Sequence, residues 1–125
     1  KLIVTGGVDG TARLWDTSGK QLAVLEGHQG LVTGNFSPDG KLIVTGGVDG
    51  TARLWDTSGK QLAVLKGHQG LVTGGFSPDG KLIVTGGEDG TARLWDTPGK
   101  QLAVLKGHQG LVTGNFSPDG KLIVT

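Results

Sequence analysis

The chain alternates short apolar or β-branched runs with polar, glycine-rich connections. Within one stretch the runs occupy 42–45, 51–55, 61–65 and 71–76. Each has the length of an ordinary β-strand. None shows the 3.6-residue spacing of an amphipathic helix. The pattern therefore predicts an all-β chain of short antiparallel strands.

The connections carry the residues that tight turns require. Asp49-Gly50 lies between the first two runs, and 77–80 (Ser-Pro-Asp-Gly) follows the fourth. Asp-Gly tolerates the positive φ of hairpin turns, and Pro and Gly occupy typical β-turn positions. The glycines, 25 in 125 residues, thus separate strands and do not indicate disorder.

The sequence repeats every forty residues. Segments 1–40, 41–80 and 81–120 agree at all but four columns, and 121–125 repeats 1–5. A period of this length is typical of β-propeller blades. The strands are apolar throughout, so each four-stranded sheet is expected to be covered on both faces by neighbouring sheets.

Composition excludes several classes of function. Twelve basic and eleven acidic residues leave a net charge of +1, which gives no reason to expect a nucleic-acid or anionic-membrane partner. There is no cysteine for a disulfide or a thiolate metal site. No apolar run approaches the roughly 20 residues that span a bilayer, and no signal segment opens the sequence. For a natural chain we expect a cytoplasmic location.

Several motifs recur once per repeat and resemble those of the WD40 family. Gly-His stands at 27–28, 67–68 and 107–108, and Trp-Asp at 15–16, 55–56 and 95–96. Phe-Ser-Pro-Asp-Gly and the Asp of the turn before the Trp strand are also present. The resemblance covers the whole chain, and the near-identity of the repeats is similar to that of recently amplified or designed propellers.

The resemblance implies strand order and a hydrogen-bonded tetrad in each blade. Strands a to d, counted outward from the central channel, correspond to 31–36, 42–45, 51–55 and 61–65. In the tetrad Thr accepts a hydrogen bond from Trp, His accepts from Thr, and Asp accepts from His, which satisfies polar groups that burial would otherwise leave unpaired. The implied sets are His28, Thr45, Asp49 and Trp55; then His68, Thr85, Asp89 and Trp95.

A third tetrad is divided between the two ends of the sequence. His108 and Thr125 lie at one end, and Asp9 and Trp15 at the other. Three blades are too few to close a propeller, which typically has 4–8 blades. We therefore expect Asp9 and Trp15 to come from a neighbouring molecule, with either Thr125 or Thr5 as the threonine.

The number of strands also predicts assembly. The order b-c-d, a-b-c-d, a-b-c-d, a-b contains one strand b more than three blades need, so 1–5 and 121–125 compete for one position. Uncapped ends favour head-to-tail association into a ring. Small residues at Ala12, Ala23 and Gly34 permit close stacking and favour nine blades from three chains. Six blades from two chains is the alternative.

No motif indicates catalysis, a cofactor or a metal. Thr, His and Asp within hydrogen-bonding reach resemble a catalytic set, but burial beside Trp favours a structural network. The turn 46–50 is not a phosphate-binding loop. The histidines occur one per repeat, and Asp39, Asp79 and Asp119 lack the density of a calcium loop.

The sequence therefore predicts a non-enzymatic repeat scaffold that self-assembles. The alternative is a protein-interaction platform on the face of the d–a and b–c loops, with the missing blades supplied by a second copy or by a different partner. The residues of this face are Gln29, Gln69, Gln109, Val8, Val48 and Glu88. Its protein partner is not indicated.

Overall fold

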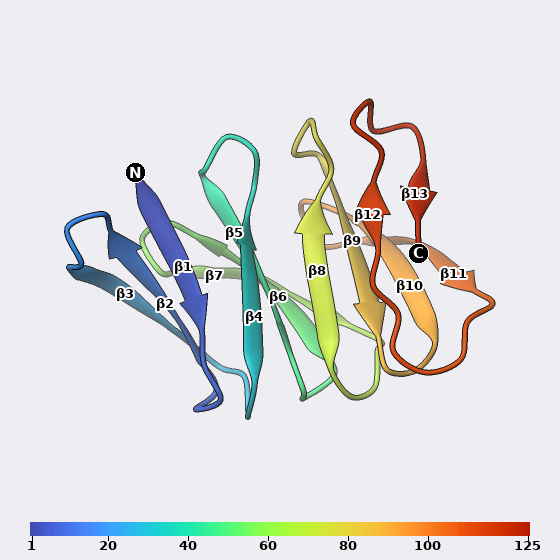
Figure 1. The fold of residues 1–125 in the computed structure, drawn as a ribbon, viewed down its shortest axis with the longest axis horizontal. Helices are drawn as coiled ribbons and strands as arrows, with labels where there is room; N and C mark the ends of the chain where they lie inside the picture. The colour runs from blue at the N-terminus through green and yellow to red at the C-terminus, as the bar shows by residue number, and fades with distance from the viewer.

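A computed structural model describes residues 1–125 and contains thirteen strands and no helix. The strands form four antiparallel sheets that lie side by side in chain order, with the two termini in the first and last sheets (Figure 1). This is the strand order b-c-d, a-b-c-d, a-b-c-d, a-b. No helix that could span a membrane is present.

The first sheet has three strands and lacks strand a. It consists of β1 (Leu2–Gly6), β2 (Thr11–Asp16) and β3 (Gln21–Glu26). β1 pairs with β2 over five positions, from Leu2 opposite Asp16 to Gly6 opposite Ala12. One edge of β1 is therefore without a strand partner.

The two middle sheets are complete and have the same register. Their strands are β4 (Val32–Phe36), β5 (Leu42–Gly47), β6 (Thr51–Asp56) and β7 (Gln61–Lys66), followed by β8 (Val72–Phe76), β9 (Leu82–Gly87), β10 (Thr91–Asp96) and β11 (Gln101–Lys106). Strand b is longer than the predicted 42–45, because Gly46 and Gly47 continue the ladder opposite Thr33 and Val32. Strand a begins at Val32 and not at the predicted Leu31.

The last sheet is the smallest. It contains only β12 (Asn115–Phe116) and β13 (Ile123–Val124), paired at two positions. The equivalent strands β4 and β5 pair at five. Strands c and d are missing here, whereas the first sheet lacks strand a, and both sheets contain a strand b.

Each apolar core lies between two neighbouring sheets. Ala12, Leu14 and Leu25 of the first sheet are buried against Ile43 and Trp55 of the second. The next core repeats this arrangement one sheet later, with Ala52, Leu54, Leu65, Ile83 and Trp95. Burial between sheets, and not within one sheet, therefore holds the array together.

Candidate functional site

Two hydrogen-bonded networks connect strands within the middle sheets. In the second sheet the Trp55 indole Nε1–H donates to Thr45 Oγ1 at 2.8 Å. His28 Nε2 lies 2.7 Å from the same oxygen, and His28 Nδ1 lies 3.1 Å from Asp49 Oδ1. The third sheet repeats the network with Trp95, Thr85, His68 and Asp89 at matching distances.

The acceptor chemistry of these networks determines where the protons lie. A carboxylate only accepts, so His28 Nδ1–H donates to Asp49. Nε2 of the neutral ring is then an acceptor, and the Thr45 hydroxyl donates to it while accepting from Trp55. Every polar atom of this chain of bonds is satisfied, and no buried side-chain nitrogen or oxygen lacks a partner.

Two residues outside the expected sets complete each network. The Thr51 hydroxyl donates to Asp49 Oδ1 at 2.9 Å, and an Arg53 nitrogen lies 3.6 Å from Asp49 Oδ2. Thr91 and Arg93 repeat these contacts around Asp89. Neither residue belongs to the tetrads expected from the sequence, although both recur in every repeat.

Burial excludes a nucleophilic role for the Thr, His and Asp set. Thr45 and Thr85 have no solvent-exposed surface, and the side chains of His28 and His68 are equally inaccessible. A nucleophile needs an open approach for a substrate. These groups therefore serve as cross-strand connections.

The environment shifts the pKa of both members of each His–Asp pair. Burial lowers the pKa of His28 and His68, and the hydrogen bond and charge of the partner carboxylate only partly oppose it. Burial raises the pKa of Asp89, but the hydrogen bonds from His68 and Thr91 outweigh it and hold the pKa at about 2. At neutral pH the pairs are thus neutral imidazole and charged carboxylate.

Acid is expected to destabilise the protein in two steps. Because the pKa of each buried His is lowered in the folded state, the unfolded chain binds more protons as the pH falls below about 6.5. The free energy of unfolding that depends on the neutral histidines is fully present at neutral pH and declines as the pH falls below about 6.5. A second decline in stability follows below the ordinary Asp pKa of 3.8, because Asp89 of the unfolded chain then takes up a proton while the folded protein, with a pKa of about 2, does not. Thermal midpoints measured between about pH 7.5 and pH 5 test the first step.

A double variant provides the control for this pH dependence. His28→Gln with His68→Gln removes both titrating rings and keeps polar side chains at the two positions. The variant is expected to be less stable at neutral pH, with a smaller change in midpoint between pH 7.5 and pH 5. An equal change in both proteins would contradict the assignment.

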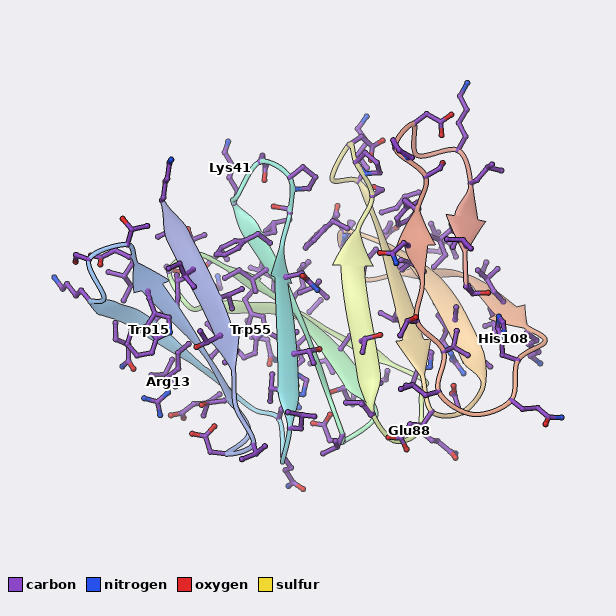
Figure 2. The ribbon with its side chains drawn as sticks, viewed as in Figure 1. Arg13, Trp15, Lys41, Trp55, Glu88 and His108 are labelled. Carbon is purple, nitrogen blue, oxygen red and sulfur yellow. The ribbon has the colours of Figure 1, made fainter.

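The third expected tetrad is not assembled within one chain. The Trp15 indole donates to Thr5 at 2.8 Å in the first sheet, where Asp9 bonds only to its neighbours Thr11 and Arg13. His108 bonds to Thr125 at 2.6 Å in the last sheet. Trp15 and His108 lie at opposite ends of the array (Figure 2). Each end therefore holds half of a network, and each half contains a threonine.

The two ends also expose halves of an apolar core. The third core contains Val84, Ala92 and Val112 with half-buried Leu105, but no Trp packs there. Trp15 is only half-buried at the other end, and its neighbour Ile3 is 47% exposed. Ile3 and Trp15 are the equivalents of Ile43 and Trp55, which fill the first core.

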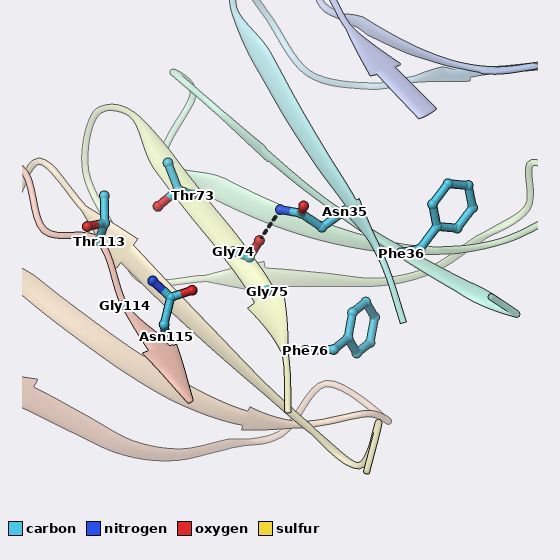
Figure 3. Close-up of a pocket in the computed structure, with 9 residues that line it drawn as sticks. All are labelled: Asn35, Phe36, Thr73, Gly74, Gly75, Phe76, Thr113, Gly114 and Asn115. Atoms are coloured by element: carbon cyan, nitrogen blue, oxygen red, sulfur yellow. Dashed lines mark hydrogen bonds between the residues drawn. The ribbon is translucent and has the colours of Figure 1, made fainter. Parts of the chain in front are cut away.

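A polar groove runs over the inner strands β4, β8 and β12. Thr73, Gly75 and Asn115 help to line it, and Asn35 Nδ2 donates to the Gly74 carbonyl at 2.8 Å (Figure 3). Its lining contains no acid, base or thiol. No three His, Cys, Asp or Glu side chains gather as a possible metal site.

The predicted interaction face lies at the loops on one edge of the array. Gln29, Gln69 and Gln109 are exposed there, as is Glu88. Val8 is 79% exposed and Val48 41%. The face carries no aromatic or Arg side chain of the kind that usually anchors a protein partner.

Comparison with known families agrees with this architecture. The family described as WD domain, G-beta repeat matches residues 1–16, 19–56, 59–96 and 99–125. The chain belongs to the WD40 family. The first and last matches are partial: 99–125 corresponds to the start of a repeat, 1–16 to its end, and the two overlap at the duplicated 121–125 and 1–5. WD40 repeats indicate a non-enzymatic protein-interaction scaffold. No curated protein sequence matches the chain.

Proposed function

We propose that this WD40 chain is a self-assembling, non-enzymatic scaffold, in which three copies close into a nine-bladed ring. The observation that carries the proposal is the complementarity of the two ends. The first sheet lacks strand a, and the last sheet contains strands a and b only. Joined head to tail, they supply all four strands of one blade, with strand b present twice.

Apolar side chains support this joint. The third core contains Val84, Ala92 and Leu105, with Ile123 as the equivalent of Ile43, but it has no equivalent of Trp55. Trp15 of a second copy supplies that side chain. The joint would then bury the same residue types that the two internal interfaces bury.

Polar groups support the joint as well. His108 has a threonine partner but no carboxylate, and Asp9 with Trp15 has no histidine. Docking brings His108 of one copy to Asp9 and Trp15 of the next. The site is thus incomplete without the second copy, which contributes half of the tetrad.

The spacing at the outer edge of the blades favours nine blades over six. A Cβ added at Gly59 would lie 3.2 Å from the Ala23 methyl group of the preceding sheet, and one at Gly99 would lie 3.0 Å from Ala63. Small residues here let the outer edges approach closely. A smaller outer spacing narrows the wedge between blades, so more blades complete the circle.

The mass of the assembly in solution tests the proposal. One chain has a mass of 12.8 kDa, so light scattering after size exclusion is expected to give about 38 kDa for three copies. About 26 kDa would correspond to a six-bladed ring and contradict the wedge argument. A folded monomer would contradict closure by copies and indicate that a different protein supplies the missing blades.

A pair of tryptophan variants separates assembly from folding. Trp15→Ala removes a side chain that belongs to none of the internal cores. The variant is expected to yield folded chains that assemble to a lower mass. Trp55→Ala removes the matching side chain from an internal core, and is expected to cost about 3–5 kcal/mol of stability. Equal masses for Trp15→Ala and the unmodified chain would show that Trp15 is not at an interface.

A further inference from the structure

Two copies of strand b compete for one position in the joined blade, because 1–5 and 121–125 have the same sequence. We infer that residues 1–7 of one copy occupy this position and displace residues 121–125 of the next. The inference rests on the proposed ring and specifies which strand completes its joint. Three independent observations favour the N-terminal strand.

The first observation is the number of available pairing positions. In the middle sheets, strand a pairs with strand b at five positions, the last two being Gly46 and Gly47 opposite Thr33 and Val32. Residues 1–7 contain equivalents of all five. Residues 121–125 have no counterpart of the two glycines, and β13 pairs with β12 at only two positions. Strand a of the joint, 111–116, thus gains a full ladder only from the N-terminal copy.

The second observation is the point at which the end of one chain would meet the neighbouring copy, which differs between the two candidate strands. If 121–125 of one copy filled the position, Thr125 would meet Gly6 of the neighbouring copy in the middle of strand b. The matching residues Thr45 and Gly46 are buried, so the displaced Thr5 and the group that follows Thr125 would crowd one buried point. If 1–7 fill it, the interruption lies beside Lys1, at the position of the exposed Lys41. A charged group there remains in water.

The third observation is how firmly each candidate is held before docking. Gly6 lies against the next sheet so closely that a Cβ would fall 1.9 Å from the Val32 carbonyl oxygen. The Val32 amide also donates a hydrogen bond to the Gly7 carbonyl at 2.9 Å, so this end of strand b is bonded to the next sheet. Gly120 precedes the other candidate, and a Cβ there would meet only Pro78 at 3.6 Å. The C-terminal segment can therefore leave at Gly120 while the N-terminal segment stays.

The exchange changes the partner of His108. In the free chain His108 bonds to Thr125. In the ring it bonds instead to Thr5 of the neighbouring copy, which already accepts from Trp15. Thr5 thus completes the tetrad, and the displaced residues 121–125 become an exposed extension at each joint.

Two matched variants test this assignment. Thr5→Val and Thr125→Val make the same chemical change in the two identical segments. Thr5→Val is expected to lower the thermal midpoint of the ring, and Thr125→Val to leave it unchanged. The reverse result, or equal effects of both variants, would overturn the inference.

Hydrogen exchange of the unmodified ring gives a second readout that needs no variant. The amides of Leu2–Gly6 are expected to exchange at least about tenfold more slowly than those of 122–125. Faster or equal exchange in the N-terminal strand would overturn the inference. The mass of each sample is measured in parallel, so that a chain that stays monomeric counts against the proposed ring and not against the choice of strand.

Discussion

Gly46→Ala is expected to destabilise the protein by about 3 kcal/mol, although it adds only one methyl group. The added Cβ would lie 2.1 Å from the carbonyl oxygen and 2.7 Å from the carbonyl carbon of Val72. These are backbone atoms of β8 in the neighbouring sheet, so no side chain can rotate away. The two sheets must separate, and Leu54 and Leu65 of one sheet then lose contact with Trp95 and the rest of the core on the other.

Gly75→Ala is the matched control for this prediction. Gly75 is also a strand glycine without positive φ, and a Cβ there would meet nothing within 4 Å. Its equivalents in the other repeats are Asn35 and Asn115. The change is expected to alter stability by no more than about 0.5 kcal/mol. Chemical denaturation at equal chain concentration compares the two variants, and similar midpoints would contradict the proposed close approach of the sheets.

Thr45→Val is expected to destabilise the protein by about 2 to 6 kcal/mol, since each of two buried groups left unpaired costs about 1–3 kcal/mol. Valine has nearly the shape of threonine, so no cavity forms. The hydroxyl alone is lost, and with it the partner of the Trp55 indole at 2.8 Å and of His28 Nε2 at 2.7 Å. Thermal and chemical unfolding measure the loss.

Thr33→Val makes the same change one strand away. The Thr33 hydroxyl reaches only the Gly46 carbonyl, at 3.5 Å, and the residue is half-buried. A bond this long contributes little. The variant is expected to differ from the unmodified chain by about 0.5 kcal/mol or less. If both valine variants were equally stable, the buried network would not contribute as described.

Most of the strand pattern could be predicted from the sequence. Turn residues such as Asp49-Gly50 and the apolar runs between them act locally, and β6, β7 and β8 begin within one residue of the predicted positions. The exception was the end of strand b. Gly46 and Gly47 resemble turn residues in sequence, yet they pair with β4, because strand a passes beside them and completes their hydrogen bonds.

The candidate site was predicted in part. The WD40 resemblance named His28, Thr45 and Asp49, and the structure places them in one network with Trp55. Thr51 and Arg53 were missed because their role depends on reaching the same carboxylate, which a residue pattern does not display. The division of the third set between the two ends followed directly from the order of residues in the chain.

The sequence by itself determined the number and order of strands, the repeat and the incomplete blade at each end. These properties depend on turn chemistry and hydrophobic pattern, which act over a few residues. Only the tertiary structure decided that Gly46 has no room for a methyl group whereas Gly75 does, because the atoms that matter belong to the next sheet. It also distinguishes the identical segments 1–5 and 121–125. The first continues into Gly6 and Gly7, which lie against Val32 of the next sheet, whereas the second follows a turn where a Cβ at Gly120 would meet only Pro78.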